Sequence, residues 1–152
     1  MGIKKEIEVS ETLFKGKITE LKCLTYFLEQ GYIVSTPELP CPYDFLLDTG
    51  TQILKIQVKT SHLVKEVEGA IEFKTRSVTH NSNGYTSRIY TKNTVDYFAT
   101  FWENECYLVP FNECGNHSKR LRLAPSKNGQ VKNITFAKDY IAKEVLSNLI
   151  NK

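Results

Sequence analysis

The side chains best suited to chemistry lie close together in residues 43–61 (YDFLLDTGTQILKIQVKTS). Residues 53–59 alternate apolar and polar side chains, which is typical of a β-strand whose successive side chains point to opposite faces. Lys55, Gln57 and Lys59 are therefore expected on one polar face. The preceding residues 48–52 form a small polar cluster with one glycine, which predicts a tight turn between two strands.

The turn decides whether an acid joins that polar face. If Gly50 and Thr51 form a two-residue loop, counting outward places Asp44 opposite Gln57, with their Cβ atoms roughly 5 Å apart. A loop one residue longer would move Asp44 to the other face of the hairpin. The prediction of a shared site therefore depends on an even loop length.

A carboxylate, an amide and an amine on one face suggest metal chemistry. Carboxylate and amide oxygens are hard ligands that suit Mg²⁺, which keeps several waters and contacts phosphate. A neighbouring lysine can stabilise phosphate charge or help to activate a water held by the metal. The alternative is a surface hairpin whose exposed face is simply polar, as is common in antiparallel sheets.

An apolar periodicity predicts a helix at about residues 17–30, ended by Gly31. Its inner face is expected to consist of Ile18, Leu21, Leu24 and Leu28, while residues 1–15 form a loose charged arm or the approach to the helix. Glu20 lies at the edge of this face, where a partly buried carboxylate requires a cation or a metal. The alternative is an exposed acid near the first turn, favoured by the helix dipole.

The remaining chain predicts further short elements of an α/β protein. A helix at 139–151 would turn Ile141, Val145, Leu146, Leu149 and Ile150 inward. The predicted strands are residues 32–35, 70–75, 95–102 and 106–110, and the last two form a buried hairpin around the turn 103–105. Residues 36–42 form a stiff proline-rich loop and residues 80–84 a loop or turn.

Length and composition fit one ordinary globular domain. The chain has 152 residues, of which 41% are hydrophobic and 24% charged, typical of a soluble protein. It has no long apolar run and no signal-peptide pattern, so a cytoplasmic protein without membrane contact is expected. The four cysteines form no C-x-x-C pair and are expected as free thiols. Cys106, Cys114 and His117 fit no standard zinc spacing.

A basic segment offers contacts for a phosphate backbone. Residues 114–138 carry six Lys or Arg and no acid, in a chain of net charge +3. This favours a nucleic-acid partner, although a solvated loop is the alternative. The candidate DNA contacts are Lys119, Arg120, Arg122, Lys127 and Lys132, with a second strip formed by Arg88 and Lys92 beside Tyr85 and Tyr90.

Read in order, these residues resemble the PD-(D/E)XK nuclease superfamily. The helix carries Glu20, Pro42–Asp44 matches the PD element, and Gln57–Lys59 matches the (D/E)XK element. The resemblance covers about residues 16–61. Within the superfamily it is closest to the group I intron-associated homing endonucleases, in which Gln commonly replaces the second acid and the run reads QVKT, as at residues 57–60 here. Residues 95–110 resemble that group more loosely.

The resemblance implies a restriction-endonuclease-like α/β fold with a mixed β-sheet flanked by helices. Residues 1–152 would form one endonuclease domain, with its catalytic core at about 16–61 and later strands, basic segment and C-terminal helix at 62–152. The implied activity is Mg²⁺-dependent hydrolysis of phosphodiester bonds in double-stranded DNA, with Mn²⁺ able to substitute.

The resemblance also implies residue roles. Asp44 would be the main metal ligand, joined by the Gln57 side-chain oxygen and the Val58 carbonyl. Glu20 would hold a water of the metal or a second ion, and Lys59 would orient or activate the attacking water. The chain departs from the strict pattern at Gln57 and by the residue between Pro42 and Asp44. An amide carries no negative charge, so metal affinity is expected to be lower than with Glu.

Three functions remain open from the sequence. The first is a sequence-specific homing endonuclease. The second is a structure-specific nuclease resembling Holliday junction resolvases, and the third is a non-catalytic DNA-binding protein with a degenerate nuclease core. One chain offers one site, whereas cutting both strands needs two. A homodimer or homotetramer is therefore expected, and two-fold symmetry matches a roughly palindromic target.

Overall fold

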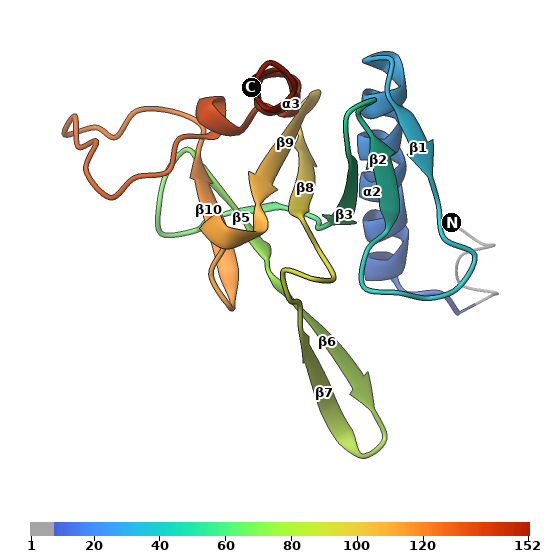
Figure 1. Cartoon of the computed structure of the whole chain (residues 1–152). Helices are drawn as coiled ribbons and strands as arrows, with labels where there is room; N and C mark the ends of the chain where they lie inside the picture. Colours follow the sequence, from blue (N-terminus) through green and yellow to red (C-terminus); the bar gives the residue numbers. More distant parts are fainter. Residues whose placement is uncertain (1–7) are drawn as a thin grey trace.

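The structure is a computed structural model that describes residues 8–152, apart from the side chains of residues 78–81 and 85–88. Its centre is a five-stranded sheet in the order β1-β2-β3-β8-β9 (Figure 1). These strands are β1 (Ile33–Ser35), β2 (Phe45–Asp48), β3 (Ile53–Val58), β8 (Tyr97–Trp102) and β9 (Glu105–Pro110). β3 and β8 are parallel and the other neighbours antiparallel, so the predicted mixed sheet is confirmed.

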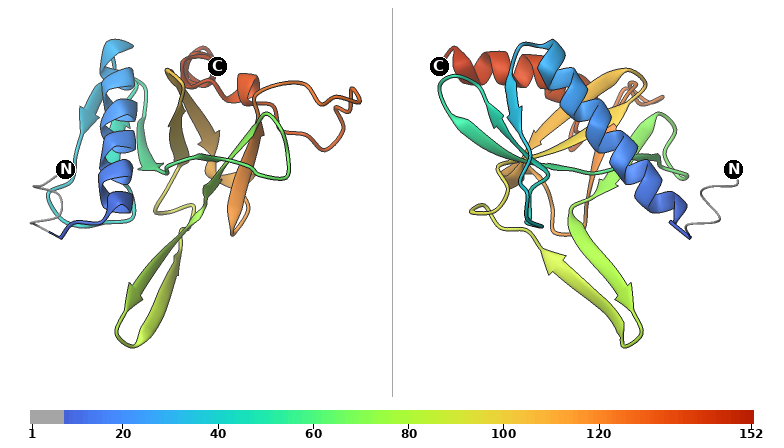
Figure 2. Two further views of the ribbon diagram at one scale, coloured as in Figure 1. Left: turned by 180° about the vertical axis from the view of Figure 1, so that it is seen from behind. Right: turned by 90° about the vertical axis from the view of Figure 1, so that its right-hand side faces the viewer.

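Two smaller sheets and two short 3₁₀ helices complete the strand region. They comprise β4 (His62–Leu63), β5 (Ala70–Lys74), β6 (Arg76–Asn81), β7 (Gly84–Ile89), β10 (Ser118–Arg122), η1 (Phe111–Glu113) and η2 (Ala137–Tyr140). β10, β5 and β4 form one sheet, and β6 pairs with β7. The β6–β7 hairpin projects away from the rest of the molecule (Figures 1 and 2). The turn expected at residues 80–84 is its tip, but the hairpin itself was not predicted.

Strands β8 and β9 separate two hydrophobic cores, so the predicted hairpin at residues 95–110 is buried on both faces. Successive side chains on a strand point to opposite faces. Ala99 and Leu108 accordingly pack with the two helices, whereas Phe98 and Val109 pack with β5 and β10. β3 is an inner strand of this sheet, because it pairs with β2 on one side and with β8 on the other.

Helix α2 spans Glu11–Glu29 and therefore begins well before the predicted start near Lys17. Ser10 is its N-cap, and its hydroxyl accepts the backbone N–H of Leu13 at 3.3 Å. Serine is a preferred N-cap because its oxygen satisfies one of the unpaired amides of the first turn. Residues 11–15 thus belong to the helix and not to a loose arm.

The inner face of α2 was predicted wrongly. Thr19, Cys23 and Phe27, spaced by four residues, are buried against the sheet. Of the four residues of the expected apolar face, three are about half exposed: Ile18 is 50%, Leu21 50% and Leu28 51% exposed. The fourth, Leu24, is partly buried. The spacing was helical, but the aliphatic side chains do not mark the face that contacts the sheet.

Helix α3 spans Ala142–Ile150, so its start lies after the predicted Asp139, and η2 precedes it. Leu146 is fully buried as expected, and Val145 and Leu149 pack at the edge of the same core. Neither helix among residues 8–152 is long and apolar enough to cross a membrane.

The four cysteines are free thiols, as predicted. Cys23 and Cys106 are fully buried, and burial raises the pKa of the Cys106 thiol well above its usual value. In the described part of the chain no three His, Cys, Asp or Glu side chains gather at one point, so Cys106, Cys114 and His117 form no metal cluster.

Candidate active site

The β2–β3 hairpin has the even register that the site requires. Asp48 pairs with Ile53 and Phe45 with Ile56. In the turn, the Thr49 N–H donates to the Gln52 carbonyl at 3.0 Å. Gly50 adopts a φ of +87°, a conformation that glycine adopts without steric cost and that suits the first position of a type II′ turn. The predicted two-residue loop is confirmed.

Asp44 lies one residue before the paired part of β2 and does not pair directly with Gln57. Its backbone N–H donates to the Ile56 carbonyl at 2.8 Å, and its carboxylate accepts the backbone N–H of Val58 at 2.7 Å. The carboxylate therefore reaches past Gln57 to the end of β3. The predicted acid is brought to this strand, but through a backbone contact.

The polar face of β3 is present as predicted. Leu54, Ile56 and Val58 are buried, whereas the intervening Lys55 and Gln57 are partly exposed. Lys59 continues this face directly after the strand. Its amine donates to the Tyr90 hydroxyl at 2.9 Å and to the Arg76 carbonyl at 3.4 Å.

Gln57 lies against the other predicted neutral ligand. Its side-chain N–H donates to the Val58 carbonyl at 3.2 Å. The amide nitrogen of Gln57, and not its oxygen, therefore faces that carbonyl. The Asp44 carboxylate contacts the same residue, Val58, through its N–H.

Glu20 projects from the middle of α2, not from its first turn, so the alternative of an acid at the helix N-terminus is wrong. Its side chain is only 19% exposed and accepts a hydrogen bond from Lys17 at 3.2 Å. A partly buried carboxylate was expected to need a cation, and Lys17 provides one.

The electrostatics of Asp44 link these residues. Burial raises the pKa of Asp44 to about 6, against the opposing effect of the Val58 N–H. The Glu20 charge raises this pKa further, while Lys59 and Lys17 lower it. Glu20 from the helix and Lys59 from the hairpin therefore both influence the charge of the same carboxylate.

This donor set fits a hard divalent cation. Asp44 and Glu20 supply carboxylates, and Gln57 and Val58 supply neutral oxygens, all of which suit Mg²⁺ or Mn²⁺. Both causes that raise the pKa of Asp44, burial and the Glu20 charge, are relieved by a bound cation. Family members generally use divalent metal ions, and these residues are compatible with one.

A row of hydroxyl groups joins the helix to the end of β3. The Thr60 hydroxyl donates to Thr19 at 3.2 Å, and Thr19 donates to the Lys15 carbonyl at 2.9 Å. Next along the chain, Ser61 and Thr100 share a hydrogen bond of 2.6 Å. Thr19 precedes Glu20 and Thr60 follows Lys59, so this contact holds the two halves of the site together. Sequence reasoning missed it, because threonines carry no distinctive spacing.

The structure describes only part of the second predicted DNA-contact strip. Lys92 is exposed in the turn at residues 91–94, where the Asn93 carbonyl accepts the Lys55 amine at 2.8 Å. The backbone of Arg88 pairs with Ser77 in the projecting hairpin, but its side chain lies outside the described part, as does that of Tyr85. Tyr90 is 7% exposed and is a packing residue.

The basic segment forms strand β10 and the loop after it, not one open cationic surface. Most of the residues predicted to contact DNA from this segment already bind protein groups. Lys119 donates to the Glu113 carbonyl and Arg122 to the Ala124 carbonyl. Arg120 pairs with the Glu72 carboxylate, and Lys127 pairs with the Glu68 carboxylate. Lys132 is exposed in the loop. This loop lies at the end of β10 away from the β6–β7 hairpin (Figures 1 and 2).

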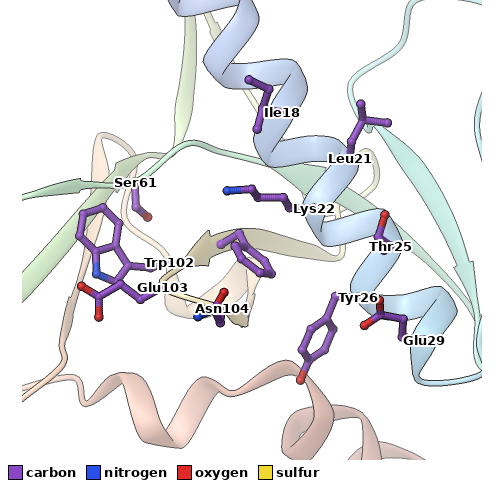
Figure 3. Close-up of a pocket in the computed structure, with 11 residues that line it drawn as sticks. Ile18, Leu21, Lys22, Thr25, Tyr26, Glu29, Ser61, Trp102, Glu103 and Asn104 are labelled. Atoms are coloured by element: carbon purple, nitrogen blue, oxygen red, sulfur yellow. The ribbon is translucent and has the colours of Figure 1, made fainter.

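A hollow of about 830 Å³ lies beside α2 but is separate from this site (Figure 3). Its lining includes Ile18 and Lys22 from the helix and Trp102 from the end of β8. Residues two apart on a helix point to nearly opposite sides. Ile18 and Lys22 therefore face away from Glu20, and the hollow belongs to the other side of α2.

An acid before one hairpin strand, a lysine after the next and a second acid on the flanking helix are an arrangement that fits a nuclease core on a mixed α/β sheet. Residues 10–143 match the PD-(D/E)XK endonuclease family, and the chain belongs to that family. It is a DNA endonuclease, and the predicted superfamily and fold are confirmed.

A solved structure gives independent support for the fold. The bacterial homing endonuclease I-Ssp6803I superposes with a TM-score of 0.71 at 21% sequence identity, and the match covers 94% of this chain and 98% of that one. The likeness shows a common fold over nearly the full length of both. A comparison with curated protein sequences gave no match.

Proposed function

We propose that this endonuclease is Mg²⁺-dependent, hydrolyses phosphodiester bonds in double-stranded DNA and recognises a specific sequence, as a homing endonuclease does. The observation that supports it most is the Asp44 carboxylate, whose pKa is raised to about 6 by burial and by Glu20, while Lys59 lowers it. The influence of a second acid and a lysine on this carboxylate supports a site for a cation and a phosphate. The similarity in fold to I-Ssp6803I supports the homing class.

We propose that Asp44, the Gln57 side-chain oxygen, the Val58 carbonyl and Glu20 hold the cation. When bound, the ion supplies a Lewis acid that polarises a phosphoryl oxygen and makes water a better nucleophile. Mn²⁺, which also favours oxygen donors, substitutes for Mg²⁺. To bind either ion, Asp44 must be ionised, and a pKa of about 6 leaves it ionised at neutral pH.

Lys59 works beside these ligands as a hydrogen-bond donor. Its amine lies at the end of β3, next to Val58, and is held by the Tyr90 hydroxyl at 2.9 Å. From there it orients the attacking water or stabilises the negative charge that develops on the phosphate. In this role the amine must be held in a fixed position, because charge stabilisation depends on donors that are already in place.

The DNA and subunit contacts follow from the same proposal. We expect phosphate contacts at Arg88 and Lys92 near the site. Further candidates on β10 and its loop are Lys119, Arg120, Arg122 and Lys132, whereas Lys127 is already paired with Glu68. The chain acts as one endonuclease domain. Since each chain has one candidate site and DNA has two strands, we expect a homodimer or homotetramer, which sedimentation equilibrium measures directly.

The central experiment is cleavage of supercoiled DNA in Mg²⁺. Asp44→Ala and Lys59→Ala should each lower the cleavage rate by at least about 100-fold, as expected for loss of a metal ligand or of a hydrogen-bond donor that stabilises the developing charge. Asp48→Ala and Lys143→Ala are the matched controls, because they remove the same charges far from the site. If all four variants cleave like the wild type, the proposed site is wrong.

The substrate class is tested separately. A homing endonuclease cleaves a linear duplex that carries its target and ignores branched DNA of unrelated sequence. Preferential cutting of four-way junctions, without activity on linear duplex, would instead identify a junction resolvase. DNA binding without cleavage in Mg²⁺ or Mn²⁺ would identify a non-catalytic protein.

A further inference from the structure

Lys59 is held at the base of the β6–β7 hairpin. Its amine contacts the Arg76 carbonyl at 3.4 Å and the Tyr90 hydroxyl at 2.9 Å. Arg76 is the first residue of β6, and Tyr90 follows the last residue of β7. The first pair of this hairpin is Arg76 with Ile89. Both contacts therefore come from the point where the hairpin leaves the body of the protein.

Tyr90 is itself fixed by packing. It is 7% exposed, and its ring meets the Phe98 ring edge-on, with centroids 5.5 Å apart. Phe98 lies beside Gln57 across the β3–β8 pair. The Lys59 amine also lies 4.8 Å from the centre of the Tyr90 ring. The tyrosine thus presents a fixed hydroxyl and a fixed ring face to the lysine.

We propose that Tyr90 is a positioning residue for Lys59: its hydroxyl accepts a hydrogen bond from the amine and ties the lysine to the base of the hairpin. This inference rests on the proposed function, in which Lys59 acts on the scissile phosphate. A lysine side chain has several rotatable bonds, and a fixed acceptor reduces the orientations that the amine can adopt. Movement of the hairpin base would accordingly move the amine.

The variant Tyr90→Phe separates the hydrogen bond from the packing, because it keeps the ring and removes only the hydroxyl. It should lower the single-turnover cleavage rate at saturating enzyme about tenfold, equivalent to about 1.4 kcal/mol, with unchanged DNA affinity. Tyr140→Phe is the matched control, since Tyr140 also loses a phenol hydrogen bond, to Glu113 at 2.6 Å, far from Lys59. A loss of affinity with an unchanged cleavage rate would overturn the proposal.

A double-mutant comparison tests whether Tyr90 acts through Lys59. In a Lys59→Ala background, Tyr90→Phe should cause no further loss, because the group that it positions is gone. A further tenfold loss in that background would show an independent role for Tyr90 and overturn the proposal. If Lys59→Ala alone cleaves like the wild type, the proposed function fails, which is a different result.

A readout without DNA completes the test. Acetylation of Lys59 by an activated ester, followed by peptide mass spectrometry, should be several-fold faster in Tyr90→Phe than in the wild type or Tyr140→Phe. The amine then keeps only the longer contact, with the Arg76 carbonyl at 3.4 Å, and is more mobile. Equal acetylation rates in all three proteins, with melting temperatures that agree, would show that the hydroxyl does not hold Lys59.

Discussion

The Asp44 carboxylate accepts the backbone N–H of Val58 at 2.7 Å, which joins the residue before β2 to the last residue of β3. The same Val58 accepts the Gln57 amide through its carbonyl. The acid and both neutral donors are therefore connected through the backbone of one residue. A cation bound here would take the Val58 carbonyl from the Gln57 N–H that now donates to it.

Asp44 should destabilise the protein that lacks metal as the pH rises. Its pKa is about 6 when folded and about 3.9 when unfolded. The folded state therefore binds the proton more tightly, and stability falls as the pH rises from about 4 through 6. Asp44→Asn removes this cost while keeping an acceptor for the Val58 N–H. We expect it to raise the free energy of unfolding at pH 8 by about 1–3 kcal/mol.

Urea unfolding at pH 4 and pH 8, with a chelator present, measures this difference. At pH 4 the two proteins should agree closely, because Asp44 is then protonated in the folded state. A difference between them that is the same at both pH values would contradict the assigned pKa.

Gln57→Glu should tighten Mg²⁺ binding about tenfold, or about 1.4 kcal/mol, because it places a negative charge among the ligands. The change also removes the N–H that now occupies the Val58 carbonyl. Titration calorimetry measures the affinity. Gln52→Glu is the control, since it adds the same charge in the exposed turn at the other end of β3. Equal affinity in the wild type and both variants would show that Gln57 is not a ligand.

Thr19 and Thr60 should be energetically coupled. Thr19→Val keeps the shape but removes the hydroxyl that accepts from Thr60 at 3.2 Å. We expect a loss of about 1 kcal/mol in the free energy of unfolding. Thr60→Val should add little to it, which a double-mutant cycle by urea unfolding detects. Thr25→Val, on the exposed side of the same helix, is the control, and strictly additive losses at 19 and 60 would argue against the contact.

The buried face of α2 is tested by two neighbouring residues. Phe27 is fully buried, whereas Leu28 is 51% exposed. Phe27→Ala should cost about 3–5 kcal/mol, because it leaves a cavity in the core. Leu28→Ala should cost under about 1 kcal/mol. Similar losses of unfolding free energy for the two variants would contradict the assignment of Phe27, and not Leu28, to the buried face of the helix.

Salt dependence of DNA binding distinguishes the two basic regions. A lysine that contacts a phosphate contributes about 0.9 to the slope of log affinity against log salt concentration. Lys92→Ala should reduce the slope by about this amount, because Lys92 is exposed beside the polar face of β3. Lys127→Ala should leave it nearly unchanged, since Lys127 pairs with Glu68 at 2.8 Å in the distant loop. Equal reductions would show that both regions contact DNA.

The hairpin and its polar face could be predicted from the sequence because they depend on local rules. Strand alternation and a glycine turn fixed the register at residues 43–59, and the spacing of Asp44, Gln57 and Lys59 followed. The prediction was wrong only about the direct pairing of Asp44 with Gln57. The backbone contact of Asp44 with Ile56 ends the pairing of the two strands one residue early. Such a contact depends on tertiary geometry that alternation does not encode.

Other features could not be predicted because their sequence signals were weak or misleading. Ile18, Leu21 and Leu28 have the right spacing for a helix core, yet the sheet packs on the smaller Thr19 and Cys23. Strand β10 is rich in Lys and Arg, so its charge concealed a strand that buries only Leu121. The contact between Tyr90 and Lys59 joins residues far apart in the chain, and no local sequence pattern predicts it.

The β6–β7 hairpin is closed at its base by the Arg76–Ile89 pair, and the two atoms that hold Lys59 lie at that base. Residues beyond the base supply neither atom, so we expect that they can change without displacing Lys59. The hairpin would then combine a segment that tolerates change with a base that does not. Under selection for a new DNA target, the projecting segment can change while the geometry of the reaction is inherited intact.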